Sequence, residues 1–328
     1  RPYERCEIDH IQPVATGGHT DPGNGRLACR QCNRTRPHRR FNNEPWPDDA
    51  GRMPGYGAPL IEDEAFRGQI AQIERRLTAR TRAIMPVHLF GQCADMEPLL
   101  RVATRHNLFV IEDAAQALGA RYTFSDGTVR PAGTMGAVGT TSFFPSKNLG
   151  CYGDGGAIFT NDPVLGEQIR MLANHGQRIK YHHDIIGVNS RLDTLQAAIL
   201  NVKLKHLSEY EAKRQAVAAH YDGALVNPLL QRPSRAHNST HVFHQYTVKV
   251  RDGKRDDFQK YLAHNQIPSI IYYPVPLHLQ KAYRRTGSDE GSFPVTEMLS
   301  KSVISLPIHT EMDDDQLAFI TRAINDFS

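Results

Sequence analysis

The chain has 328 residues, 40% of them hydrophobic and 23% charged, which is enough for two globular domains of ordinary size. It contains no run of about 18 apolar residues and begins without the features of a signal peptide, so we expect no membrane association and a cytoplasmic location. The net charge of +4 does not by itself indicate nucleic acid, and five cysteines without disulfide-framework spacing favour a reducing compartment.

The first residues of the chain combine metal-binding and basic side chains. Six arginines and no acidic residue lie between Pro22 and Arg40. Residues 6–13, 17–19 and 24–33 resemble an HNH endonuclease, in which a divalent metal stabilises charge on the phosphate under attack. This resemblance implies a short ββα-metal-like segment with six functional residues: Asp9 and Asn33 as metal ligands, His10 as general base, Asn24 as the residue that orients His10, and Cys29 and Cys32 as half of a structural zinc knuckle.

Several readings of this segment stay open. The arginines suit DNA phosphates, and a solvated basic face explains them equally well. Four-coordinate zinc normally takes two cysteine pairs, and only the second pair is found here. We therefore expect a divalent metal or zinc, and a nucleic-acid partner, only if the segment is functional. The alternative is an inactive remnant fused to a second, shortened gene.

Residues 42–66 are rich in proline, glycine, asparagine and aspartate, a composition typical of a linker with turns. Beyond it, hydrophobic periodicity predicts a helix over 66–79, a strand over 83–87, a helix over 96–106 and a strand over 108–111 that ends at Glu112 and Asp113. This alternation indicates a parallel α/β sheet, with ligand groups at the carboxyl ends of its strands. Further strands are predicted over 138–144 and 157–160.

The last third of the chain has a different pattern. We predict helices over 194–221, a strand over 241–250, a helix over 256–265, a strand over 269–273 and a final helix over 314–327. These elements indicate a smaller α+β domain. The predicted organisation is an HNH-like segment at 1–41, a linker at 42–66, a large domain at 67–215 and a small domain at 216–328.

The sequence around Lys147 indicates a catalytic role for this lysine. It follows the predicted strand 138–144 and precedes a glycine-rich segment, while Asp113 ends an earlier strand. An enzyme that uses pyridoxal phosphate (PLP) needs a lysine amine for the aldehyde, a carboxylate for the pyridine nitrogen, and hydroxyl or N–H groups for the phosphate. Taken alone, Lys147 is typical of a surface lysine, and only its neighbours favour the chemical role.

The wider pattern resembles the DegT/DnrJ/EryC1/StrS family of sugar aminotransferases, which are fold-type-I PLP enzymes. The resemblance runs from about residue 67 to the end and is carried by residues 86–92, 112–116, 142–150, 153–156, 175–177 and 187–193. It implies a large PLP-binding domain with a mainly parallel sheet. Family members have a longer segment before this region, so we expect an incomplete sheet, exposed apolar surface and impaired folding.

The resemblance also assigns roles. Lys147 holds PLP and moves the proton between carbons, and Asp113 pairs with the pyridine nitrogen. Gln116 lies against the cofactor ring or its 3-hydroxyl, and Ser142 binds the phosphate. Asn189 reaches the phosphate of the neighbouring subunit's cofactor, which implies a homodimer.

The family also implies a reaction: glutamate donates an amino group to a nucleotide-linked keto sugar, in polysaccharide or antibiotic-sugar biosynthesis. The segment 181–193 favours a 3-keto sugar, with a 4-keto sugar as the alternative, and lysine at position 147 favours transamination over dehydration. A nuclease acting through residues 1–41 and a catalytically inactive binding protein are the competing functions. Four histidines lie where the family often has histidine, and for each a structural role is equally open: His88, His175, His278 and His309.

Overall fold

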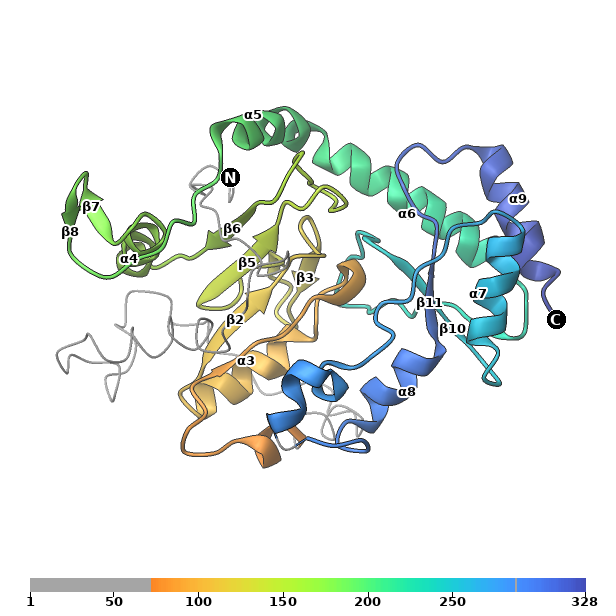
Figure 1. Cartoon of the computed structure of the whole chain (residues 1–328), viewed down its shortest axis with the longest axis horizontal. Coiled ribbons are helices and arrows are strands. Elements are labelled where there is room, and N and C mark those ends of the chain that lie inside the picture. Colours follow the sequence, from red (N-terminus) through yellow and green to blue (C-terminus); the bar gives the residue numbers. More distant parts are fainter. Residues whose placement is uncertain (1–71, 287) are drawn as a thin grey trace.

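The computed structural model describes residues 72–286 and 288–328 (Figure 1). A four-stranded sheet has the order β1-β2-β5-β6 and comprises β1 (Ala83–Ile84), β2 (Phe109–Asp113), β5 (Val138–Ser142) and β6 (Gly156–Phe159). Strands β1, β2 and β5 are parallel, and β6 is antiparallel to β5. The predicted mainly parallel sheet is thereby confirmed.

Helix α3 (Met96–Arg105) connects β1 to β2. Its apolar side chains recur at helical spacing, so that Met96, Leu100 and Ala103 all face one hydrophobic core. Val110 of β2 packs into the same core. Because neighbouring side chains of a strand point to opposite faces, Glu112 shares the inward face of Val110 while Asp113 faces the other way.

Several shorter elements surround this sheet. Strands β3 (Arg121–Thr123) and β4 (Val129–Pro131) follow β2 in the sequence and form a separate antiparallel pair. Helix α4 (Pro163–Ala173) follows β6. Its N-terminus is capped by Asp162, whose carboxylate accepts hydrogen bonds from the N–H groups of Val164 and Leu165. Strands β7 (Gln177–Ile179) and β8 (His182–His183) then form a hairpin that lies at the edge of the molecule beside α4 (Figure 1).

A long helical run leads away from the first sheet. It consists of α5 (Thr194–Lys203), one 3-10 turn (Leu204–His206) and α6 (Leu207–Ala224). Leu200 packs in a cluster beside β5 and β6, whereas Val217 and Tyr221 pack in a second core. The boundary predicted at residue 215 falls inside α6 and stays a prediction.

The second core surrounds a three-stranded antiparallel sheet of order β11-β10-β9. Its strands are β9 (Leu230–Gln231), β10 (Tyr246–Val250) and β11 (Val303–Leu306), and its helices are α7 (Arg255–His264), α8 (Pro294–Ser302) and α9 (Asp314–Asn325). Two 3-10 segments, Leu277–Leu279 and Lys281–Thr286, precede α8. Sheet and helices together confirm the predicted α+β domain.

One predicted element is wrong. Residues 269–273 form no strand, and only Ile270 makes an isolated bridge, to Ser305. Pro268 and Pro274 flank this stretch and lack the N–H that a longer ladder needs. Helix α8 and strand β11 were not predicted. Within the described part of the chain, no helix has the length and apolarity to cross a membrane.

Candidate functional site

The candidate site lies where β2 and β5 end at the same edge of the sheet. The last residue of β2, Asp113, pairs with Thr140 of β5, and the N–H of Ala114 donates to the Thr140 carbonyl oxygen at 2.8 Å. After β5 the chain turns through residues 143–151, which include Lys147, and closes where the Cys151 N–H donates to the Phe143 carbonyl oxygen at 2.8 Å. The register of two strands thus brings Asp113 and the Lys147 loop together.

This loop is held from outside as well. The ammonium of Lys203, in α5, donates to the Gly150 carbonyl oxygen at 2.5 Å. A Cβ on Gly150 would lie 2.4 Å from the Pro145 carbonyl oxygen, so only glycine permits this close approach. The loop therefore presents Lys147 from a fixed backbone.

The Lys147 side chain is half-buried, and its amine has no hydrogen-bond partner among the described residues. Burial lowers the pKa of this amine below its ordinary value, and the negative charge of Asp113 acts in the opposite direction. A lysine with a lowered pKa has more of its neutral, nucleophilic form at neutral pH. Lys147 can therefore act as a nucleophile or as a base.

The Asp113 carboxylate has one committed oxygen. Its Oδ1 accepts a hydrogen bond from the Ala115 N–H at 3.0 Å, while Oδ2 has no partner within the described part of the chain. The charge of Asp113 also acts on Tyr273, whose pKa is raised mainly by burial. One oxygen of Asp113 is thus available to a cationic or N–H donor between these side chains.

Gln116 lies in the same neighbourhood. Its Oε1 accepts from the Phe90 N–H at 2.6 Å, and its Nε2 lies 3.5 Å from the Tyr273 hydroxyl. Phe90 belongs to a 3-10 turn (Leu89–Gly91) that follows β1. The structure therefore brings Lys147, Asp113 and Gln116 to one edge of the sheet and adds Tyr273 from the smaller domain.

The two remaining predicted cofactor residues have other surroundings. Ser142 ends β5, where its Oγ accepts a hydrogen bond from the Phe144 N–H at 3.2 Å. Asn189 is exposed, and its Oδ1 accepts a hydrogen bond from Arg191 Nε at 3.0 Å. Among the described residues it makes no hydrogen bond with Lys147 or Asp113. Within one chain, Asn189 is therefore separate from the other candidates.

His244 is a residue that sequence reasoning missed. It is 6% exposed, and its Nδ1 is buried without a partner among the described residues. Burial lowers its pKa to about 3, with further lowering from the nearby cations Lys147 and Arg214, so the ring is neutral. His244 is one of two histidines in the predicted strand 241–250, and no sequence signal places it beside Lys147.

The four histidines of the sequence analysis have mostly local partners. His88 is buried against Glu112 at 2.9 Å and His278 Nε2 lies 2.9 Å from Glu297 Oε1. His309 Nδ1 accepts from the Glu311 N–H at 3.1 Å, and the His175 carbonyl oxygen lies 2.8 Å from His183 Nδ1. Six other predicted residues lie outside the described part of the chain: Asp9, His10, Asn24, Cys29, Cys32 and Asn33.

Comparison with known families agrees with this geometry. The model of the DegT/DnrJ/EryC1/StrS aminotransferase family matches residues 61–325. The chain belongs to this family. The family is one of aminotransferases, and a solved structure with the same fold, 29% identical to this chain, contains the cofactor PMP. A separate model, of the HNH endonucleases, matches residues 1–39.

Relatives with names support the same class. A dTDP-3-amino-3,4,6-trideoxy-alpha-D-glucose transaminase from Streptomyces venezuelae is 42% identical over 257 residues, which cover 78% of this chain and 66% of that protein. A pleiotropic regulatory protein from Geobacillus stearothermophilus is 44% identical over 270 residues, covering 81% and 71%. Further relatives are named as aminotransferases of 3-amino, 3-oxo or 3-dehydro nucleotide sugars.

The fold matches a solved structure of the same class. The crystal structure of DesV from S. venezuelae in complex with a ketimine intermediate has a TM-score of 0.74 and 42% identity. The match covers 78% of this chain and 68% of DesV.

Proposed function

We propose that this chain is an aminotransferase that uses PLP to move an amino group from glutamate to the keto carbon of a nucleotide-linked sugar. The proposal rests on one observation: a half-buried lysine amine and a carboxylate lie together at the carboxyl ends of β2 and β5 in a chain of an aminotransferase family. The names of its transaminase relatives favour a 3-keto sugar, with a 4-keto sugar as the alternative.

The residues present fit the cofactor. The Lys147 amine and Asp113 Oδ2 have no committed partners among the described residues, and they are the two groups that PLP requires. When bound, PLP supplies an electron sink for negative charge on the amino carbon. We assign Lys147 as the covalent anchor and the base that moves a proton, Asp113 as the partner of the ring nitrogen, Gln116 as a contact of the ring, and Ser142 as a phosphate ligand.

The test is to add PLP to the purified chain, remove the excess and record the visible spectrum. We expect an absorbance band from lysine-bound cofactor, and glutamate-dependent amination when UDP- or dTDP-linked 3-keto sugars are supplied. Amination of 4-keto sugars alone would correct the assigned position. A folded protein without the band would contradict the proposal and favour a binding role, which the name of the regulatory relative also suggests.

We also propose a homodimer, in which Asn189 approaches the partner's cofactor phosphate. The segment around β7 and β8 is exposed, and its apolar side chains Tyr181, Ile186 and Val188 are 78%, 67% and 54% exposed. Such an apolar surface on a projecting segment is typical of an interface. Sedimentation equilibrium is expected to give twice the mass of the chain for the parent. The variant Ile186→Glu is expected to give the mass of one chain. A monomeric parent would contradict this arrangement.

A nuclease activity of residues 1–41 is a second proposal, supported by the HNH match to residues 1–39. The predicted metal ligands and the nucleic-acid partner are part of this second proposal and depend on it. The cytoplasmic location and the place in sugar biosynthesis stay predictions.

A further inference from the structure

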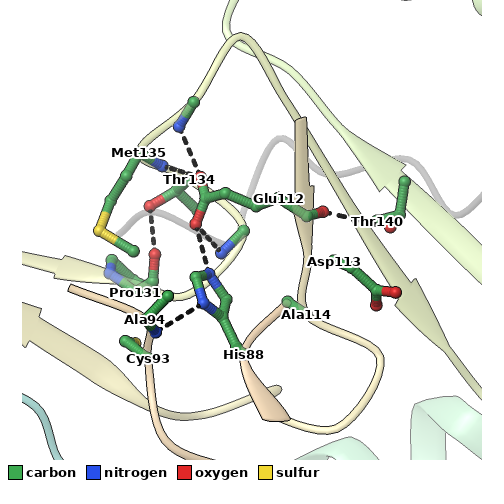
Figure 2. A network of polar contacts seen from close by, with 12 residues as sticks. His88, Cys93, Ala94, Glu112, Asp113, Ala114, Pro131, Thr134, Met135 and Thr140 are labelled. Atoms are coloured by element: carbon green, nitrogen blue, oxygen red, sulfur yellow. Dashed lines mark hydrogen bonds and ion pairs between the residues drawn. The ribbon is translucent and has the colours of Figure 1, made fainter. Parts of the chain in front are cut away.

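Glu112 is a fully buried carboxylate on the face of β2 opposite Asp113 (Figure 2). Three backbone N–H groups donate to it: Gly133 to Oε2 at 2.8 Å, Met135 to Oε1 at 2.6 Å, and Gly136 to Oε1 at 2.5 Å. Charge-assisted bonds of this kind are strong, and a buried carboxylate needs them. Glu112 therefore binds the loop that precedes β5.

His88 completes the network and is also fully buried. Its Nε2 lies 2.9 Å from Glu112 Oε2, and its Nδ1 lies 3.1 Å from the Ala94 backbone nitrogen. The Ala94 N–H can only donate, so Nδ1 must be an acceptor without a proton. The imidazole is then neutral, and its Nε2–H donates to Glu112. The surroundings thus fix the tautomer of His88.

The same residues hold the backbone of Asp113. The His88 N–H donates to the Asp113 carbonyl oxygen at 3.0 Å, and the Asp113 N–H donates to the Pro86 carbonyl oxygen at 2.9 Å. On the other side, Thr140 Oγ1 donates to the Glu112 carbonyl oxygen at 3.2 Å. The peptide that carries Asp113 is therefore tied to the segment after β1 and to β5.

The loop bound by Glu112 also packs too closely to move alone. A Cβ on Gly136 would lie 2.5 Å from the Val110 carbonyl oxygen, and one on Gly139 would lie 2.0 Å from the Gly133 carbonyl oxygen. Because the packing leaves no free space, a displacement of Glu112 or His88 is expected to shift β2 relative to β5. Strand β5 continues into the loop that carries Lys147.

We propose that Glu112 and His88 are positioning residues that set the direction of the Asp113 carboxylate and its separation from Lys147. This inference is tested by two measurements. The measurement of PLP binding rests on the proposed function, whereas the measurement of Lys147 in the cofactor-free chain does not. Neither side chain faces the cofactor side of the sheet. Both act through β2, from behind Asp113 (Figure 2).

Substitutions can separate the two hydrogen bonds of His88. Glutamine places an amide near Nε2 and keeps a donor toward Glu112, whereas asparagine places an oxygen near Nδ1 and loses that donor. We expect His88→Asn to weaken PLP binding on the order of 10-fold and to shift the visible absorbance maximum, because the buried Glu112 carboxylate loses one charge-assisted hydrogen bond. His88→Gln keeps that donor and should stay within about 3-fold of the parent. Glu112→Gln turns an NH₂ group toward backbone N–H groups in either orientation, so we expect at least the effect of His88→Asn.

The second readout needs no cofactor. The charge of Asp113 raises the pKa of Lys147, so an Asp113 carboxylate turned away must leave the Lys147 pKa lower. Competitive acylation of the cofactor-free chain, followed by mass spectrometry, measures this pKa. We expect it to fall in His88→Asn and Glu112→Gln and to be unchanged in His88→Gln.

Tyr221→Phe is the matched control, since it removes a hydrogen bond from a fully buried hydroxyl to the Pro307 carbonyl oxygen in the other core. It should lower the melting temperature without moving either readout. If His88→Asn behaves like this control, the network is only structural and the proposal fails. If Glu112→Gln does not fold, the two His88 variants decide. If the parent binds no PLP, the proposed function fails, and the Lys147 pKa still tests the positioning role.

Discussion

Lys147→Ala is expected to remove the visible band of bound PLP and to lower the rate of transamination by at least about 10³-fold. The amine is the covalent anchor and the proton carrier of the proposed reaction, and general acid–base catalysis alone contributes about 10²–10⁴-fold. Burial lowers the pKa of this amine, so the parent reacts through a neutral amine that alanine cannot supply. Absorbance after removal of excess PLP, and initial rates with glutamate, measure the two losses.

Lys260→Ala is the control for this prediction, because Lys260 is an exposed lysine whose ion pair with Asp257 lies on the surface of α7. It should behave as the parent does. Reduction of the PLP-loaded parent with borohydride, followed by peptide mapping, is expected to place the label on Lys147. A label on another lysine, or a band that survives in Lys147→Ala, would overturn the assignment.

The sequence was most informative where function and local pattern coincide. An apolar run that ends in Glu112 and Asp113 predicts a strand with ligand groups at its carboxyl end, and β2 has that form. The segment after β5 likewise predicts Lys147 in a turn. By contrast, the run 269–273 has the apolar residues of a strand, but the prolines beside it limit pairing to one bridge.

The remaining parts of the site depend on long-range packing that local pattern does not encode. His244 and Tyr273 approach Lys147 and Asp113 only because the smaller domain packs against the edge of the first sheet. Glu112 illustrates the same limit. In the sequence it is one of two adjacent acids, and only the fold shows that one is buried against His88 while the other retains an oxygen for the site.

Asp113→Asn is expected to lower the rate of transamination on the order of 10²–10³-fold while the protein keeps its fold. Asparagine has the same shape, and its side-chain oxygen can still accept the hydrogen bond from the Ala115 N–H. What is lost is the negative charge opposite the ring nitrogen, and removing one preorganised electrostatic partner typically costs a factor of this size. Initial rates, with circular dichroism to check the fold, measure the effect. Asp126→Asn, at an exposed turn, is the control.

The same substitution has a pH signature whose direction is fixed by the charges. Asp113 raises the pKa of Lys147 against the lowering effect of burial, so its neutralisation must lower that pKa further. The amine attacks PLP only when it is unprotonated, and a lower pKa keeps it unprotonated at more acidic pH. The acid limb of the PLP-binding rate should therefore move to lower pH in Asp113→Asn, even though its catalysis is slower. An unchanged acid limb would show that Asp113 does not act on Lys147, and a shift to higher pH would contradict the geometry of the site. Because the charge is removed outright here, the shift in Asp113→Asn should exceed the shifts in Glu112→Gln and His88→Asn, which only turn the carboxylate away.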